Sequence, residues 1–176
     1  MKLKDQVAIV TGAGAGNGRA IALGFAEEDW DAHLAIDLKG PFLCVQAVAP
    51  TMIEQQWGKI INITSGSAEL AIKTTGHYCV ARAGLKMLTK VAAVELAPYN
   101  INVNAIGPGI VEDTGLLKDI QANPERLAQL TGAIPLRRFA NPIRDLAPLA
   151  VFLASADADY LTGQSVYLDG GLLLVM

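Results

Sequence analysis

Three side chains of the sequence could together move a proton to or from a substrate oxygen: Ser65, Tyr78 and Arg82. Tyr78 and Arg82 are four residues apart, so on a helix they share one face. A cation one turn from a phenol favours the phenolate, and such a phenol can pass a proton. The Ser65 hydroxyl could hold the substrate oxygen beside it. Serine and tyrosine at a helix start are also ordinary capping or surface residues, so spacing alone leaves both interpretations open.

A strand and a helix must position these side chains. Residues 59–64 form a short isoleucine-rich run between turn signals, which predicts a buried parallel strand that ends at Ser65. A helix is predicted over residues 78–96, because apolar residues recur at spacings of three and four before Pro98: Ala81, Leu85, Leu88, Ala92 and Leu96. Further along the chain, two strands are expected, at residues 101–106 and 164–169, and two helices, at residues 124–130 and 142–154.

A glycine-rich turn at residues 12–18 lies between an apolar strand pattern at residues 6–11 and a helical pattern that begins at Ala20. Glycines let such a turn adopt unusual backbone angles and let a pyrophosphate approach the helix N-terminus, where free N–H groups favour negative charge. The strict GxGxxG spacing is not met, and the turn has the form TGxxxGxG. A glycine-rich turn alone is weak evidence, but the flanking strand and helix favour a phosphate-binding arrangement.

Four motifs follow one another along the chain. They are residues 11–18, Ser65 with Tyr78 after twelve intervening residues, residues 104–109, and residues 161–164 with 169–171. In this order they resemble the TGxxxGxG loop, the catalytic Ser and Tyr, the NAxxPG segment and the C-terminal signature of the short-chain dehydrogenase/reductase family. The resemblance implies one α/β domain over residues 1–176. Its expected fold is a Rossmann-like doubly wound parallel sheet, truncated to fewer strands than the full family fold.

The resemblance also implies an NAD(P)-dependent oxidoreductase that interconverts a small alcohol and a carbonyl compound by hydride transfer. Tyr78 would be the acid/base and would also contact the cofactor, and Ser65 would position the carbonyl oxygen. Arg82 would stand in for the cation that holds the nicotinamide ribose. The pyrophosphate would lie against Gly12, Gly16, Asn17 and Gly18. The nicotinamide side would be lined by Pro108, Gly109 and Val111. Thr114 is a weaker candidate, because its distance in sequence from Pro108 and Gly109 is one residue longer than in the family motif. The choice between NAD and NADP stays open.

The family's tetramers imply that this chain forms a homo-oligomer, either a dimer or a tetramer. Two long apolar helices, at residues 31–56 and 78–96, would supply the packing surface between subunits. Gly107, Pro108 and Gly109 are expected to break the strand at residues 101–106, where a crevice at the strand ends would lie.

Three departures from the family pattern bear on activity. Arg82 stands where the family has Lys, and arginine keeps the positive charge but does not give up a proton. Asp37, a second candidate catalytic position, stands where the family usually has an Asn that organises a proton relay through water. A block on the order of 70 residues, about two and a half βα units, is missing after the first helix. We therefore expect slow or absent turnover.

The segment around that junction has two interpretations. Residues 33–37 could form a strand that ends in an acid, because Asp37 falls about 20 residues after the glycine loop, where a ribose-binding carboxylate belongs. Alternatively, residues 30–43 belong to a long helix, since they match the family's central helix and are rich in alanine and leucine. The composition favours the helix.

Composition excludes several classes of function. Hydrophobic residues make up 52% of the chain and charged residues 18%, which suits a compact globular domain. The net charge of −3 comes without a basic cluster, so neither nucleic acid nor an anionic membrane is an expected partner. No apolar run approaches the roughly 20 residues of a spanning helix. Two cysteines and two histidines form no metal-ligand pattern, which predicts a reduced, cytoplasmic, metal-free protein.

Two alternatives to the enzyme stay open from the sequence. One is a non-catalytic oligomeric scaffold of the same ancestry, built on the two apolar helices. The other is a deletion product of that family that folds only in part.

Overall fold

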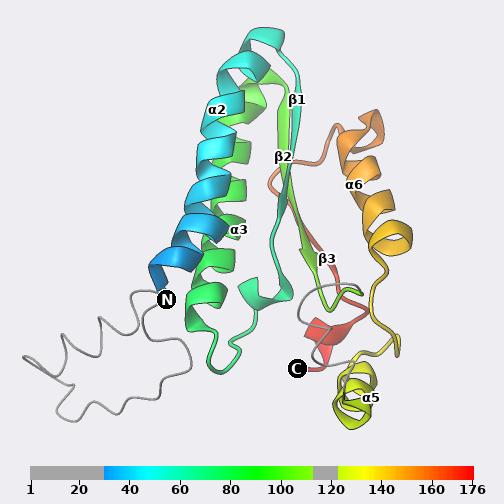
Figure 1. Cartoon of the computed structure of the whole chain (residues 1–176). Coiled ribbons are helices and arrows are strands. Elements are labelled where there is room, and N and C mark those ends of the chain that lie inside the picture. The colour runs from blue at the N-terminus through cyan, green and yellow to red at the C-terminus, as the bar shows by residue number, and fades with distance from the viewer. Residues whose placement is uncertain (1–29, 113–122) are drawn as a thin grey trace, which may run out of the picture.

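The computed structural model describes residues 30–112 and 123–176, which are built on a three-stranded sheet (Figure 1). The strands are β1 (Gly58–Ile63), β2 (Ile101–Pro108) and β3 (Ser165–Leu168). All are parallel and follow the order β1-β2-β3, with Gly58 opposite Ile101 and Ala105 opposite Ser165. The predicted α/β class is confirmed, and each of these strands lies within two residues of its predicted bounds.

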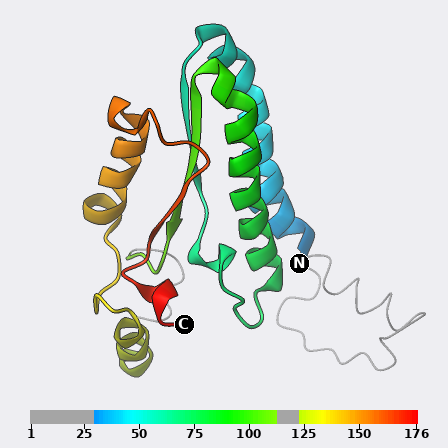
Figure 2. The ribbon, with the colours of Figure 1, turned by 180° about the vertical axis from the view of Figure 1, so that it is seen from behind.

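Helices cover both faces of this sheet (Figures 1 and 2). Helices α2 (Gly40–Gln55) and α3 (Gly76–Leu96) lie side by side on one face, and α6 (Ala147–Ala154) lies on the other. Side chains alternate along β2 because successive residues of a strand point to opposite faces. Val103 joins the apolar cluster under α2 and α3, whereas Ile106 packs with Leu153 of α6. This is the doubly wound arrangement expected from the sequence.

Helix α3 follows its predicted apolar spacing closely. It begins two residues before the predicted start and buries Ala81, Leu85, Ala92 and Leu96. The remaining predicted core position, Leu88, is only partly buried, and fully buried Thr89 lies next to it. The Thr89 hydroxyl donates to the Leu85 carbonyl oxygen at 2.9 Å and accepts from Asn62 of β1 at 2.9 Å. These bonds let a polar side chain occupy the core between helix and strand.

Residues 30–39 are helical, so the interpretation of residues 33–37 as a strand is wrong. The chain is helical from Trp30, passes through a wide π-turn, η1 (Ala35–Lys39), and continues as α2. The Gly40 N–H donates to the Ala35 carbonyl across this wider turn. Pro41 has no N–H to donate, and a π-turn is one way to accommodate a proline without ending a helix. Gly40 and Pro41 therefore extend the helix rather than forming a turn.

The end of β2 also differs from expectation. Gly107 and Pro108 remain in the strand, because Gly107 lies opposite Tyr167 and Pro108 opposite Leu168 in the pairing with β3. A Cβ atom on Gly107 would lie 2.4 Å from the Tyr167 ring, so only glycine fits at this contact. The break begins two residues later than predicted, at Gly109.

Short helices connect the main elements. Asn123 and Asn141 cap two of them: the Asn123 side chain accepts from the Arg126 N–H, and the Asn141 side chain accepts from Ile143 and Arg144. The predicted helix at residues 142–154 is a π-turn followed by α6. The short elements are η2 (Gly66–Ala68), η3 (Ala97–Tyr99), α5 (Pro124–Ala133), η4 (Pro142–Leu146), η5 (Ala156–Ala158) and η6 (Leu172–Leu174).

Candidate functional site

Ser65 lies directly after β1, where it caps the short helix η2. Its hydroxyl oxygen accepts from the Ser67 N–H at 3.2 Å and donates to the Ser67 hydroxyl, also at 3.2 Å. Among the described residues, Ser65 therefore bonds to Ser67 rather than to Tyr78. In this geometry Ser65 is a helix cap. Its hydroxyl would have to break the bond to Ser67 before it could donate a hydrogen bond to a substrate oxygen.

Tyr78 and Arg82 share one face of α3, as their spacing predicts. The guanidinium carbon of Arg82 lies 4.9 Å from the centre of the Tyr78 ring, within the range of a cation–π contact. Both side chains are partly buried. A fixed positive charge beside the phenol is thus present at the start of α3.

Arg82 is held from two other elements. Its Nη1 donates to the carbonyl oxygen of Ile63, the last residue of β1, at 2.9 Å. Its Nη2 donates to Oδ1 of Asp37 at 2.9 Å, forming an ion pair whose side chains are 19% and 11% exposed. The Nε of Arg82 is buried and has no hydrogen-bond partner among the described residues. The guanidinium is anchored at the carboxyl end of the sheet and still has unused N–H donors.

His33, which was not among the predicted site residues, completes this cluster. Its Nδ1 lies 3.0 Å from Oδ2 of Asp37, so each carboxylate oxygen of Asp37 has a partner. The His33 ring meets the His77 ring edge-on, with centroids 4.3 Å apart, and the Tyr78 ring at 6.0 Å. The only sequence signal was the spacing of four between His33 and Asp37 on a helix.

The predicted nicotinamide-side residues follow β2. The Gly109 N–H donates to the Leu168 carbonyl at 3.0 Å, and Val111 forms a parallel bridge with Ala140. A Cβ atom on Gly109 would lie 2.8 Å from the Cα of Asp169. The backbone of Asp169 therefore occupies the space that a side chain at position 109 would need. Pro108 ends β2 beside Gly109. The other predicted cofactor residues lie outside the described residues: Gly12, Gly16, Asn17, Gly18 and Thr114.

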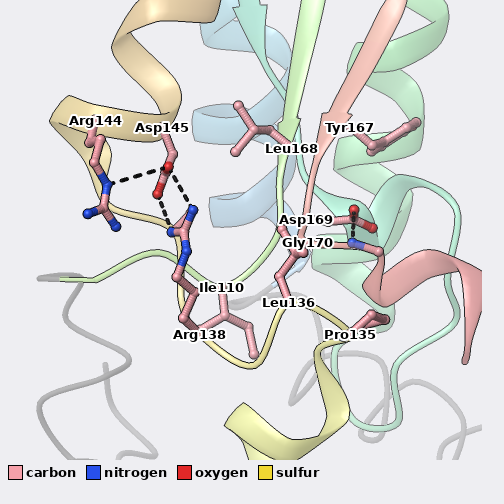
Figure 3. Close-up of a pocket in the computed structure, with 12 residues that line it drawn as sticks. Ile110, Pro135, Leu136, Arg138, Arg144, Asp145, Tyr167, Leu168, Asp169 and Gly170 are labelled. Atoms are coloured by element: carbon pink, nitrogen blue, oxygen red, sulfur yellow. Dashed lines mark hydrogen bonds and ion pairs between the residues drawn. The ribbon is translucent and has the colours of Figure 1, made fainter.

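A second cluster of charged residues lines a cavity of about 650 Å³ between the C-terminal segment and the loop before α6 (Figure 3). Arg138 donates to both carboxylate oxygens of Asp145, one of them at 2.9 Å. These bonds, with the Asn141 N–H, lower the pKa of Asp145 to about 2. Tyr167 also lines this cavity, and burial together with a hydrogen bond to Glu69 raises its pKa.

Metal and membrane features are absent from the part of the chain that the structure describes. Residues 30–112 and 123–176 contain no group of three or more His, Cys, Asp or Glu side chains arranged to hold a metal ion. Within the same ranges, every helix is too short or too polar to cross a bilayer. Cys44 and Cys79 are both free thiols.

Comparison with known proteins identifies the class. A family model described as Enoyl-(Acyl carrier protein) reductase matches residues 5–173. The match covers nearly the whole chain, including the segments that carry Ser65, Tyr78 and Arg82. The chain belongs to the short-chain dehydrogenase/reductase family.

Individual relatives are reductases and dehydrogenases. The chain is 38% identical over 156 residues to the 3-oxoacyl-acyl-carrier-protein reductase FabG of Thermotoga maritima, an alignment that covers 88% of this chain and 61% of the relative. It is 36% identical over 152 residues to 5-keto-D-gluconate 5-reductase of Escherichia coli, covering 86% and 59%. The solved structure of a gluconate 5-dehydrogenase from Burkholderia cenocepacia, in complex with NADP and tartrate, superposes with a TM-score of 0.80 at 36% identity.

The chain spans about three fifths of the length of these relatives. The Burkholderia structure is covered over 58% of its length, although 85% of this chain is matched. This partial coverage agrees with a truncated version of the Rossmann fold. The location of the missing block, after the first helix, stays a prediction because residues 1–29 lie outside the described part.

Proposed function

We propose that this protein is an NAD(P)-dependent oxidoreductase that interconverts a small alcohol and the corresponding carbonyl compound. One observation carries the proposal: the Arg82 guanidinium lies 4.9 Å from the Tyr78 ring and is anchored to the carboxyl end of β1. In open parallel sheets, ligands bind outside the carboxyl ends of the strands. A phenol paired with a fixed cation at that edge suits acid/base chemistry on a substrate oxygen.

The residues at the site fit one side of a nicotinamide cofactor. Arg82 uses two of its N–H donors inside the protein and is 19% exposed, so it can still donate to a ribose hydroxyl. The pyrophosphate would lie on the glycine loop at residues 12–18. When bound, the cofactor supplies the hydride for reduction or accepts it for oxidation.

Each residue has a defined role in carbonyl reduction. As the carbonyl carbon receives the hydride, Tyr78 gives its phenolic proton to the carbonyl oxygen and becomes a phenolate. The Ser65 hydroxyl rotates from Ser67 and donates to the same oxygen. Arg82 stabilises the phenolate through its positive charge. Alcohol oxidation runs the same steps in reverse, with the phenolate accepting the proton.

We expect this turnover to be slow. Arg82 keeps its proton and so does not return one to Tyr78 from solvent. Asp37 carries no amide donors and spends both carboxylate oxygens on Arg82 and His33. The cofactor residues that the family places in the missing block would have to be supplied in another way. The names of the relatives suggest two substrate classes for a screen, 3-oxoacyl thioesters and keto sugar acids.

Cofactor titration is the first test of this proposal. Purified protein of confirmed intact mass is titrated with NADH and with NADPH, while nicotinamide fluorescence and the emission of Trp30 and Trp57 are followed. We expect saturable binding of one or both. Absence of binding in the millimolar range, an affinity of only about 4 kcal/mol, would remove the enzyme proposal for this chain.

A non-catalytic oligomeric scaffold is the second candidate function, and the surface of α2 favours it. This helix buries none of its residues completely and leaves Phe42, Leu43 and Val48 between 41% and 47% exposed. A groove of about 530 Å³ beside it is lined largely by Leu34, Leu38, Phe42 and Leu88. A homo-oligomer, a dimer or tetramer, would cover this apolar surface. We place either form in the reducing cytoplasm, in keeping with the two free cysteines.

Light scattering tests the scaffold. Phe42→Lys should lower the mass measured in solution to that of one chain. Val151→Lys is the matched control, since Val151 is 68% exposed on α6 across the sheet.

The deletion-product alternative is tested by amide exchange. Slow hydrogen exchange of the backbone amides of Ile60 and Val103 would indicate a stable sheet. Rapid exchange of both amides would indicate that the chain folds only in part.

A further inference from the structure

Asp37 and Arg82 are distant in the sequence, yet they contact each other directly. Asp37 comes from the π-turn before α2, and Arg82 comes from the second turn of α3. Their charged atoms lie 2.9 Å apart, and both side chains are largely buried. The resemblance to the short-chain dehydrogenase/reductase family implies that each is also a position where the chain departs from the family pattern. The two departures therefore meet in one ion pair.

The pair decides where the guanidinium lies. Asp37 holds Nη2, and the Ile63 carbonyl holds Nη1, so two ends of the planar group are fixed at once. The plane is thereby kept beside the Tyr78 ring. A lysine ammonium at position 82 is a compact charge that could bond to Asp37 or to Ile63 without this planar geometry.

We propose that Asp37 is a positioning residue for Arg82, so that the two departures are one coupled change. Asp37 acts through Arg82: it orients the guanidinium toward Tyr78 and the cofactor side and balances its charge. This inference rests on the proposed function, because the role of Arg82 is toward Tyr78 and a bound nicotinamide cofactor.

The charges of the two side chains explain why Asp37 and Arg82 would have to change together. Asp37→Asn leaves the Arg82 guanidinium with a neutral partner in a largely buried place, which is unfavourable for a charge. Arg82→Lys leaves Asp37 facing an ammonium that the carboxylate draws away from Tyr78. The double variant has a neutral amide beside an ammonium, and the lysine is then free to turn toward the cofactor.

A double-mutant cycle measures this coupling. The chains are the natural protein, Asp37→Asn, Arg82→Lys and the double variant, and the readouts are the Kd for NADPH and for NADH and the free energy of unfolding in urea. Each single substitution should weaken binding of the preferred cofactor about tenfold. The double variant should bind within about threefold of the natural protein, instead of the hundredfold loss that independent effects would give.

The ion pair of Lys59 with Asp159 is the matched control. Lys59 is the second residue of β1, at the strand end away from Ser65, so the cycle Lys59→Met with Asp159→Asn should leave cofactor binding unchanged. Coupling at positions 37 and 82 in both unfolding and cofactor binding supports the positioning role. Coupling in unfolding alone would overturn it, because the pair would then be purely structural.

The same measurements separate failure of the inference from failure of the proposed function. If the chains bind cofactor and the two substitutions multiply independently, the inference is wrong and the proposed function stands. If none of the four chains binds NADH or NADPH, the proposed function fails and the positioning role falls with it.

Discussion

Two clusters of this protein contain the same three residue types in different surroundings. On the α3 side of the sheet, Arg82 and Asp37 are largely buried beside the partly buried Tyr78, and the ion pair is made through a single nitrogen. In the cavity of Figure 3, Arg138 is 45% exposed and makes two bonds to Asp145, with Tyr167 on another wall. The pair with two parallel hydrogen bonds, Arg138 with Asp145, is thus the one that is more exposed to solvent.

The difference supports the proposal that the cluster of Tyr78, Arg82 and Asp37 is the one that does chemistry. The bidentate pair of Arg138 and Asp145 ties the start of η4 to the preceding loop, and Asp145 also accepts from the Asn141 N–H. These bonds hold the backbone of the loop between Arg138 and Asn141 in place. Arg82, in contrast, lies over a phenol and retains a buried Nε without a partner among the described residues. Unsatisfied donors and buried charges are costly, and proteins retain them most often at functional sites.

The largest expected effect is on turnover, and it compares the two tyrosines. Tyr78→Phe should lower the rate of carbonyl reduction by about 10²- to 10⁴-fold, because the proton donor is lost. Cofactor binding should change little. Tyr167→Phe removes only the bond to Glu69 and should leave the rate unchanged. Initial rates of NAD(P)H oxidation with a substrate found in the screen measure both, and equal effects would show that Tyr78 has no special role.

The second effect is on stability, and it compares the two aspartates. Asp37→Ala leaves the Arg82 charge unpaired in a largely buried place, so we expect the free energy of unfolding to fall by about 3 kcal/mol. Asp145→Ala should cost less, since water can solvate the exposed Arg138. Urea unfolding followed by tryptophan emission provides both values. A larger loss for Asp145→Ala would reverse the comparison.

The third effect is a pH dependence that comes from Asp145 of the cavity cluster. The pKa of Asp145 is lowered from 3.8 to about 2 by Arg138 and the Asn141 N–H. A carboxylate with a lowered pKa in the folded state stabilises the protein above its unfolded pKa, and this contribution is lost as the pH falls through the folded value. The stability difference between the natural protein and Asp145→Asn should therefore be constant above pH 3.8 and shrink toward about pH 2. Urea unfolding at several pH values checks this, and a difference that grew on acidification would contradict it.

Local patterns in the sequence predicted most of the fold. The spacing of apolar residues located α3 and placed Tyr78 and Arg82 on one face, and the isoleucine run located β1. The bond between Ser65 and Ser67 was also within reach, because serine at a helix start often caps its own turn. These features depend on residues close together in the chain.

Features that depend on distant contacts were not predictable in the same way. Pairing with β3 keeps Gly107 and Pro108 in β2, and the sequence around Gly107 suggests a break. The contact between Asp37 and Arg82 requires the π-turn before α2 to pack beside α3, 45 residues further along the chain. No local period encodes such a crossing. The one available signal was the resemblance, which implies that both positions depart from the same family pattern.

The smallest expected effect is that of salt, and it distinguishes the two ion pairs by their exposure. Screening acts mainly on exposed charges, and the Debye length falls from about 10 Å at 0.1 M to about 3 Å at 1 M. Arg138→Met should therefore destabilise the protein less at about 1 M sodium chloride than at about 0.1 M, because the exposed pair is already weakened there. Arg82→Met should destabilise it equally at both concentrations, since Arg82 is only 19% exposed, against 45% for Arg138, and its pair with Asp37 is screened little in either solution. The two losses, measured by urea unfolding in the same salts, test whether burial separates the clusters. If salt lowered the Arg82→Met loss as much as the Arg138→Met loss, water and ions would reach Asp37, and a guanidinium held in that way would not be fixed tightly enough to orient a charge toward Tyr78.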